Sequence, residues 1–138
     1  MTDIAPETAP PPLEVMRGVI PYFTVENAAA AADFYAKAFG AKDLGRMAAD
    51  DGKRLIHVQM EINGGSIMFN DPFPEQGHAA NPSDNYVLTL VVEDGQAWFD
   101  RAVAAGCEVV MPFQQMFWGD RYGQVRDPFR ILWAVNEA

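Results

Sequence analysis

Side chains that could bind or catalyse gather near the end of the chain, in the stretch FWGDRYGQVRDPFR at 117–130. Arg126 could hold a carboxylate or phosphonate, because its planar guanidinium makes two charge-assisted hydrogen bonds. The plainer alternative is an ion pair of Arg126 with Asp127 or Glu61 across neighbouring strands. Asp127-Pro128 is also typical of a turn. The stretch therefore predicts a loop, a strand that contacts ligand, and a turn.

His57 is the other candidate for chemistry, as a general acid or base. The alternative is a histidine that is hydrogen-bonded within a sheet. The chain has two His residues, at 57 and 78, and neither HxH nor HxxxH spacing occurs. The single Cys107 has no base beside it in sequence and is expected to be a small buried side chain. Local spacing thus offers no metal-binding motif.

Composition narrows the class of protein. A length of 138 residues suits one domain, and the net charge of −9 argues against nucleic acid and anionic membranes as partners. The N-terminus lacks the pattern of a secretory signal, and no apolar run reaches the roughly 20 residues that span a bilayer. One cysteine rules out an internal disulfide and fits a reducing compartment. We expect a cytoplasmic protein.

The sequence divides into a proline-rich tail, residues 1–13, and a single domain, residues 14–138. Within the domain, 18–25 reads as a strand and 28–39 as a helix between an Asn27 cap and a Gly40 stop. The same order returns with a strand at 85–92 and a helix at 96–105, between Asp94 and Gly106. Two similar units, about 18–73 and 84–137, are therefore predicted.

Short matches support this repeat. Val25-Glu26-Asn27 recurs as Val92-Glu93-Asp94, and Gly52-Lys53-Arg54 recurs in part as Gly119-Asp120-Arg121 at the same spacing. Two copies of a strand–helix–strand–strand–strand unit suggest a domain with pseudo-two-fold symmetry.

Strand periodicity predicts which side chains face a cavity, because alternate residues of a strand point to opposite faces. The apolar set at 56, 58, 60 and 62 is expected to pack on a helix, so its neighbours face away. The predicted ligand-binding surface mixes aromatic and polar side chains, as small-molecule sites do. Its members are Tyr22, Thr24, His57, Gln59, Phe69, Thr89, Trp118, Tyr122, Gln124 and Arg126.

The runs DFYAKAFGAK, VEDGQAWFDRAVAAGCEVVMP and FWGDRYGQVRDPFRILW resemble the PhnB-like branch of the glyoxalase/bleomycin-resistance/dioxygenase (vicinal oxygen chelate) superfamily. The resemblance implies an α+β fold in which two pseudo-symmetric βαβββ units form a curved mixed sheet around a cavity. One residue departs from the family pattern. Arg130 stands where Gly usually follows Asp-Pro-Phe, so either Arg130 is strained or the hairpin turns differently.

Metal-using members of the superfamily carry ligands on the first and last strands of each unit. By resemblance, those positions fall near Ile20, Val87, Met68 or Phe69, and Ala134. None of these side chains suits a cation that needs oxygen or imidazole donors. The expectation is a site without metal or cofactor.

The function that the sequence favours is metal-free binding of a small organic molecule, to sequester or sense it, in a homodimer. The alternative is a lyase, isomerase or dioxygenase of the same superfamily that uses a divalent metal or His57. A third possibility is an interaction module whose cavity is filled by its own Phe and Trp side chains. The sequence leaves the ligand unnamed.

Overall fold

The computed structural model describes residues 13–138, which divide between Asn81 and Pro82 into two compact units. The predicted tail thus lies outside the described residues except for Leu13. Unit 1 contains one βαβββ set between two short 3-10 helices. In chain order its elements are η1 (Leu13–Met16), β1 (Tyr22–Thr24), α1 (Ala28–Phe39), β2 (Lys42–Ala48), β3 (Leu55–Ile62), β4 (Gly65–Asn70) and η2 (Pro74–Gln76). Unit 2 repeats the βαβββ order: β5 (Leu88–Val91), α2 (Gly95–Ala105), β6 (Glu108–Gln115), β7 (Arg121–Arg126) and β8 (Leu132–Glu137).

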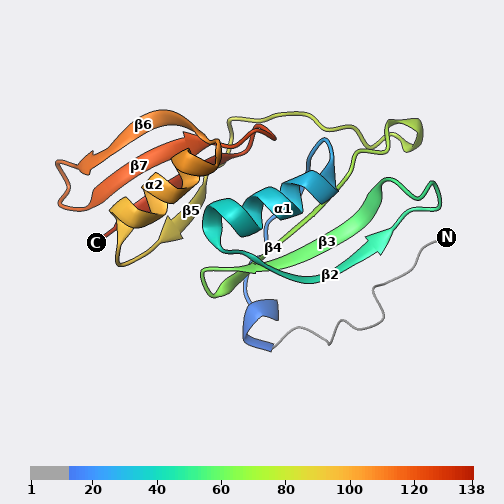
Figure 1. Cartoon of the computed structure of the whole chain (residues 1–138), viewed down its shortest axis with the longest axis horizontal. Coiled ribbons are helices and arrows are strands. Elements are labelled where there is room, and N and C mark those ends of the chain that lie inside the picture. The colour runs from blue at the N-terminus through green and yellow to red at the C-terminus, as the bar shows by residue number, and fades with distance from the viewer. Residues whose placement is uncertain (1–12) are drawn as a thin grey trace. The chain divides into compact units, whose positions relative to one another are not determined.

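Each unit forms one four-stranded mixed sheet with its helix against it (Figure 1). The strand orders are β1-β4-β3-β2 and β5-β8-β7-β6, and the first strand of each unit pairs in parallel with the last. Gly52-Lys53-Arg54 leads into β3 and Gly119-Asp120-Arg121 into β7, which hold the same place in the two sheets. The predicted α+β repeat is confirmed.

Caps fix the helix limits where the sequence predicted them. The Asn27 side chain accepts a hydrogen bond from the Ala30 amide at 3.2 Å, and Gly40 ends α1 with a φ of 68°. In α2, Asp94 accepts from the Ala97 amide at 3.2 Å. These side chains satisfy backbone groups that a helix end leaves unpaired. No helix in residues 13–138 is long and apolar enough to cross a bilayer.

Aromatic packing holds the core of unit 1 between α1 and its sheet. Phe23 of β1 stacks on Phe69 of β4 with ring centroids 5.5 Å apart, and Tyr35 of α1 meets Phe69 edge-on at 5.5 Å. Val58 of β3, the register partner of Phe69, is fully buried. The helix is therefore fixed over the middle of the sheet by dispersion and burial of apolar area.

The core of unit 2 is built from different side chains on the same plan. Trp133 and Val125 face each other on β8 and β7 and are buried. Gly123 is needed here, because a Cβ would lie 2.7 Å from the Phe99 ring and 2.8 Å from the Phe113 backbone. Cys107 is buried, as predicted, and burial raises the pKa of its thiol to about 12.

The turn between β7 and β8 accommodates Arg130 in the left-handed region, with a φ of 72°. Asp127 fixes this turn from the inside. Its carboxylate accepts from the amides of Phe129 and Ile131 at 2.8 and 3.0 Å and from the Trp133 indole at 2.9 Å. Of the two outcomes that the sequence allowed, the strained backbone is the one that the structure adopts.

Candidate functional site

The face of each sheet away from its α-helix, here called the back face, carries most of the predicted site residues. In unit 1, Tyr22 and Gln59 are both register partners of Met68, and Thr24 is the partner of Asn70, so these side chains share one face. His57 lies on the same face, two residues before Gln59. The predicted alternation along β1 and β3 therefore holds.

Tyr22 and His57 form a hydrogen-bonded pair on this face. The Tyr22 hydroxyl lies 3.0 Å from His57 Nδ1, and the ring centroids are 5.5 Å apart. Partial burial lowers the pKa of His57 and raises the pKa of Tyr22. Both groups are therefore neutral near pH 7, and the imidazole could accept a proton.

A second polar chain runs beside this pair. The Thr24 hydroxyl donates to Asn70 Oδ1 at 2.8 Å, and Thr24 Oγ1 also lies 2.8 Å from His78 Nε2. Because the single hydroxyl proton goes to Asn70, His78 donates to Thr24. His78 belongs to the segment after η2, so this chain attaches that segment to the sheet.

The N-terminal segment covers another part of the back face. Gln59 donates to Met16 Sδ at 2.9 Å and to Ser66 Oγ at 3.2 Å, while the Ser66 hydroxyl donates to the Val15 carbonyl. Gln59 is consequently 7% exposed. It lies on the predicted face but is occupied by a segment of the chain itself.

A pocket of about 560 Å³ opens beside this face in unit 1. Its walls come from the turn between β2 and β3, the start of β3, the end of β4 and the segment around η2. The lining residues are Ala49, Asp50, Asp51, Arg54, Ile56, Asn70, Phe73, Glu75, Gln76 and His78.

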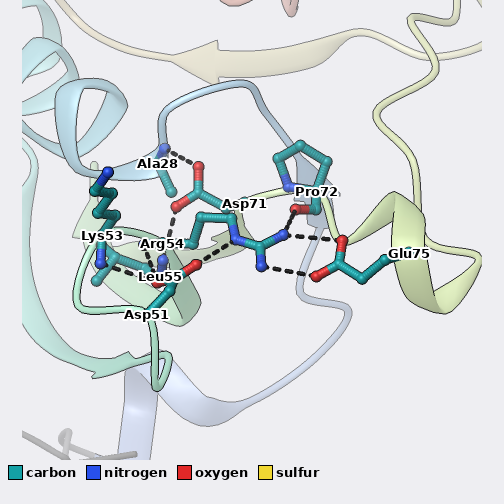
Figure 2. Close-up of polar contacts among 8 residues, drawn as sticks. All are labelled: Ala28, Asp51, Lys53, Arg54, Leu55, Asp71, Pro72 and Glu75. Carbon is teal, nitrogen blue, oxygen red and sulfur yellow. Dashed lines mark hydrogen bonds and ion pairs between the residues drawn. The ribbon is translucent and has the colours of Figure 1, made fainter.

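Arg54 ties the walls of this pocket together (Figure 2). Its guanidinium donates to Asp51 at 2.7 Å, to Glu75 at 3.1 and 2.7 Å, and to the Pro72 carbonyl at 3.2 Å. It also lies over the Phe73 ring, 4.2 Å from the centroid. The bonds to Glu75 and then Asp51 raise the pKa of Arg54, so it stays charged.

The two carboxylates respond in the opposite direction. Hydrogen bonds from the Arg54 and Lys53 amides and from the guanidinium hold the pKa of Asp51 far below its usual value. The pKa of Glu75 is lowered chiefly by the Arg54 guanidinium. Behind them, buried Asp71 accepts from the amides of Ala28 and Leu55, both at 2.7 Å. The pocket wall is thus rigid and negatively charged.

In unit 2, Tyr122, Gln124 and Arg126 alternate along β7 with the buried Gly123 and Val125, and so lie on its back face. Gln124 donates to the Tyr122 hydroxyl at 3.0 Å, and the Trp118 ring meets Tyr122 edge-on at 5.7 Å. Thr89, the partner of Ala134, joins them. Arg126 pairs with exposed Asp84 at 3.6 Å, a partner other than the Asp127 or Glu61 considered from sequence.

Phe69 does not belong to this surface, contrary to the prediction. Its pairing with Val58 places it on the α1 face, where it is fully buried between Phe23 and Tyr35. A two-residue turn, Asn63-Gly64, sets this register, and Asn-Gly between apolar runs is a strong hairpin signal. Applying that signal would have placed Met68, and not Phe69, on the predicted ligand-binding surface.

The donors at the family's metal positions do not fit a metal ion. The positions that the resemblance implies, near Ile20, Val87, Met68 and Ala134, carry alkyl and thioether side chains. The strand residues paired with Met68 and Ala134 are Tyr22 and Thr89. Phenol, thioether, hydroxyl and methyl groups are poor ligands for the divalent cations that imidazole and carboxylate bind. Across residues 13–138, no three His, Cys, Asp or Glu side chains lie close enough to share a metal ion.

Sequence reasoning missed the pocket residues Asp51, Arg54, Phe73, Glu75 and His78. Arg54 was noticed as part of the repeat but was given no role. Apart from Asp51, its partners lie up to 21 residues away in the segment after β4, and no local pattern brings them together. The Pro-Phe-Pro cluster at 72–74 was the available signal, because it marks an ordered turn.

Comparison with known proteins agrees with this architecture. The uncharacterized protein Rv0887c of Mycobacterium tuberculosis is 40% identical over 131 residues, covering 91% of this chain and 76% of that protein. TioX from Micromonospora sp. ML1 superposes with a TM-score of 0.70 at 25% identity, covering 88% of this chain and 98% of TioX. The PhnB protein from Bacillus cereus gives a TM-score of 0.69 at 17% identity, with 88% and 100% coverage.

Residues 19–135 match the family described as the Glyoxalase/Bleomycin resistance protein/Dioxygenase superfamily. The match spans both βαβββ units and the motifs that carried the resemblance. This chain belongs to that superfamily.

Proposed function

We propose that this protein binds a small organic molecule without a metal ion, and that it sequesters or senses that molecule. The observation that carries the proposal is the pocket of unit 1. Its volume of about 560 Å³ falls within the range of roughly 300–1,000 Å³ that is usual for small-molecule sites. Its lining combines three apolar side chains, Ala49, Ile56 and Phe73, with polar and charged groups. Several of these polar groups are held by hydrogen bonds.

The donor set supports the metal-free form of the proposal. The paired positions on the first and last strands offer no imidazole or carboxylate to hold a divalent cation. The family description itself includes bleomycin resistance protein, which fits binding as one mode of action in this superfamily.

The back face of unit 2 is the second candidate surface. Thr89, Trp118, Tyr122, Gln124 and Arg126 offer hydroxyl, aromatic, amide and cationic groups there. Arg126 is available because its partner Asp84 is exposed and 3.6 Å away. If Arg126 holds an anionic group of the ligand, Arg126→Met weakens binding by about 1.5–3 kcal/mol, the contribution of a charged hydrogen bond. We also keep the homodimer and the cytoplasmic location as predictions.

An enzyme is the second candidate function, and the Tyr22–His57 pair is what favours it. A neutral imidazole that is hydrogen-bonded to a phenol could remove a proton from a bound carbon or oxygen acid. His57→Gln would then abolish turnover while leaving binding in place. If the wild-type protein turns over no bound compound, and His57→Gln changes only its binding, this second candidate is wrong.

Native mass spectrometry with elemental analysis tests the first proposal. Protein purified without added ligand is expected to retain a small molecule and to hold zinc, nickel, manganese and iron well below one atom per chain. About one metal per chain, removed by EDTA with a loss of stability, contradicts metal-free binding.

A further inference from the structure

Asn70 is a buried polar group of the unit 1 pocket with an unused donor. It is 9% exposed, and its Oδ1 accepts from Thr24, which His78 holds in place. Among residues 13–138, Asn70 Nδ2 has no hydrogen-bond partner. Native proteins keep few buried donors unpaired, because each one loses water without replacement. An unpaired amide donor in a pocket wall points to a ligand that supplies an acceptor.

The charges of the same pocket favour a cation. Its lining carries three carboxylates, Asp50, Asp51 and Glu75, and one cation, Arg54. Four of the five N–H groups of Arg54 are already bonded, and its face lies on Phe73. Little of Arg54 remains for an anionic ligand, and the excess of carboxylates attracts positive charge.

We infer that the unit 1 pocket binds an organic cation, such as an amine, that also carries a carbonyl-type acceptor. The carbonyl oxygen accepts from Asn70 Nδ2, and the cationic nitrogen lies near the carboxylates of Asp51 and Glu75. Ile56 and Phe73 contact the apolar body of the molecule. This inference rests on the proposed function and adds the chemical class of the ligand.

Four matched compounds separate the two features in an NMR titration of ¹⁵N-labelled protein. 4-(Aminomethyl)benzamide has both the cation and the carbonyl, benzylamine has the cation alone, benzamide has the carbonyl alone, and 4-(acetamidomethyl)benzoate is an anion. We expect the first to bind about tenfold more tightly than either single-feature compound, as one good hydrogen bond or ion pair allows. The Asn70 side-chain NH₂ signals should shift with the benzamides and not with benzylamine.

Two variants assign the effect to the proposed groups. Asn70→Leu keeps the size and removes the donor, together with the Oδ1 that accepts from Thr24, so 4-(aminomethyl)benzamide should bind no better than benzylamine. Glu75→Gln keeps an acceptor for Arg54 and removes one charge, so affinity for both amines should fall several-fold while affinity for benzamide is unchanged. Gln96→Leu, at an exposed position of α2 outside both candidate surfaces, is the matched control and should change nothing. Should Asn70→Leu fail to fold, Glu75→Gln still tests the charge preference.

The outcomes distinguish this inference from the proposed function. Tighter binding of the anion, or shifts at Tyr22 and His57 without shifts at Asn70, overturns the ligand class and leaves small-molecule binding intact. If no compound shifts any signal at millimolar concentration, the inference is wrong. If native mass spectrometry also finds no retained molecule, the proposed function fails with it.

Discussion

Each unit has a carboxylate at the end of its last strand, but the two carboxylates accept hydrogen bonds from different parts of the fold. In unit 1, Asp71 follows β4 and joins the first amide of α1 to the first amide of β3. In unit 2, Glu137 ends β8 and, among residues 13–138, accepts only from Gly95, the first residue of α2, at 2.8 Å. Both carboxylates stabilise a helix N-terminus. Only Asp71 also anchors the strand that begins at the pocket.

The arginines that lead into β3 and β7 differ in the same way. Arg54 engages two carboxylates, a carbonyl and the Phe73 ring. Arg121 donates to Gln96 at 3.1 Å and lies 4.6 Å from the centroid of Phe113. The repeat therefore preserves where a side chain stands, while the surrounding segments decide what it does. In unit 1, Asp71 and Arg54 at these positions hold a charged pocket wall in place.

The largest expected difference between the units is in the two carboxylates. Asp71→Ala leaves two buried amides unpaired and should lower the free energy of unfolding by about 2–4 kcal/mol. Glu137→Ala removes one partly exposed hydrogen bond and should cost about 0.5–1 kcal/mol. Urea denaturation measures both, and Asp71→Asn, which keeps an acceptor oxygen, should lie between them. Equal losses would show that the strand anchor adds nothing.

Replacing Arg54 of the unit 1 pocket and Arg126 of the unit 2 back face by Met compares the stability that each arginine contributes. Arg54→Met removes the centre of the network in Figure 2 and should shift the urea midpoint clearly downward. Arg126→Met loses one long ion pair to exposed Asp84 and should change stability by no more than about 0.5 kcal/mol. High salt should narrow this gap, because it screens exposed ion pairs. A larger loss for Arg126→Met would contradict the assignment of the rigid wall to unit 1.

The hairpin turns offer a third comparison. Arg130 and Asn63 both have a positive φ, 72° and 49°, but this region costs Arg more than it costs Asn. Arg130→Gly should raise the free energy of unfolding by about 0.5–1.5 kcal/mol, while Asn63→Gly should change it little. Arg130→Ala is the control, since it removes the charge and keeps the strain. If Arg130→Ala raises the free energy of unfolding as much as Arg130→Gly does, the Arg130 charge destabilises the turn and the backbone conformation does not.

The smallest effect is expected between pH 7 and pH 5, and we assign it to unit 1, which holds both His residues. Burial lowers the pKa of His57, so the unfolded chain binds a proton more readily than the folded one. Stability should therefore fall slightly as pH drops from 7 to 5, and His57→Gln should flatten that slope. Below about pH 4.5, protonation of Asp51 and Glu75, whose pKa values are lowered, should destabilise the protein further. A wild-type slope that His57→Gln leaves unchanged contradicts this assignment.

Much of the fold could be predicted from local signals. Asn27, Gly40, Asp94 and Gly106 limit the helices through bonds to neighbouring residues, and those bonds need only local sequence. Strand periodicity also placed Tyr22, Thr24 and His57 correctly on the face away from α1.

The rest depended on contacts between distant segments. Phe69 was misplaced because a shift of one residue in β4 reverses every side chain of the strand. The pocket was missed because Arg54 meets Glu75 and Phe73 only after the segment beyond β4 returns to the start of β3. The unpaired donor of Asn70 could not be predicted from the sequence, because it is unusual only for being buried.

The buried indole of Trp133 has a practical consequence for unfolding experiments. All three tryptophans, at 98, 118 and 133, belong to unit 2, so intrinsic tryptophan fluorescence reports on that half of the chain alone. Trp133 is 1% exposed and hydrogen-bonded to Asp127, whereas Trp118 is 49% exposed. The emission of Trp133 should therefore shift further to the red on unfolding than that of Trp118. Circular dichroism in the far ultraviolet reports on both halves. A transition that appears earlier by one probe than by the other would reveal that the halves melt separately.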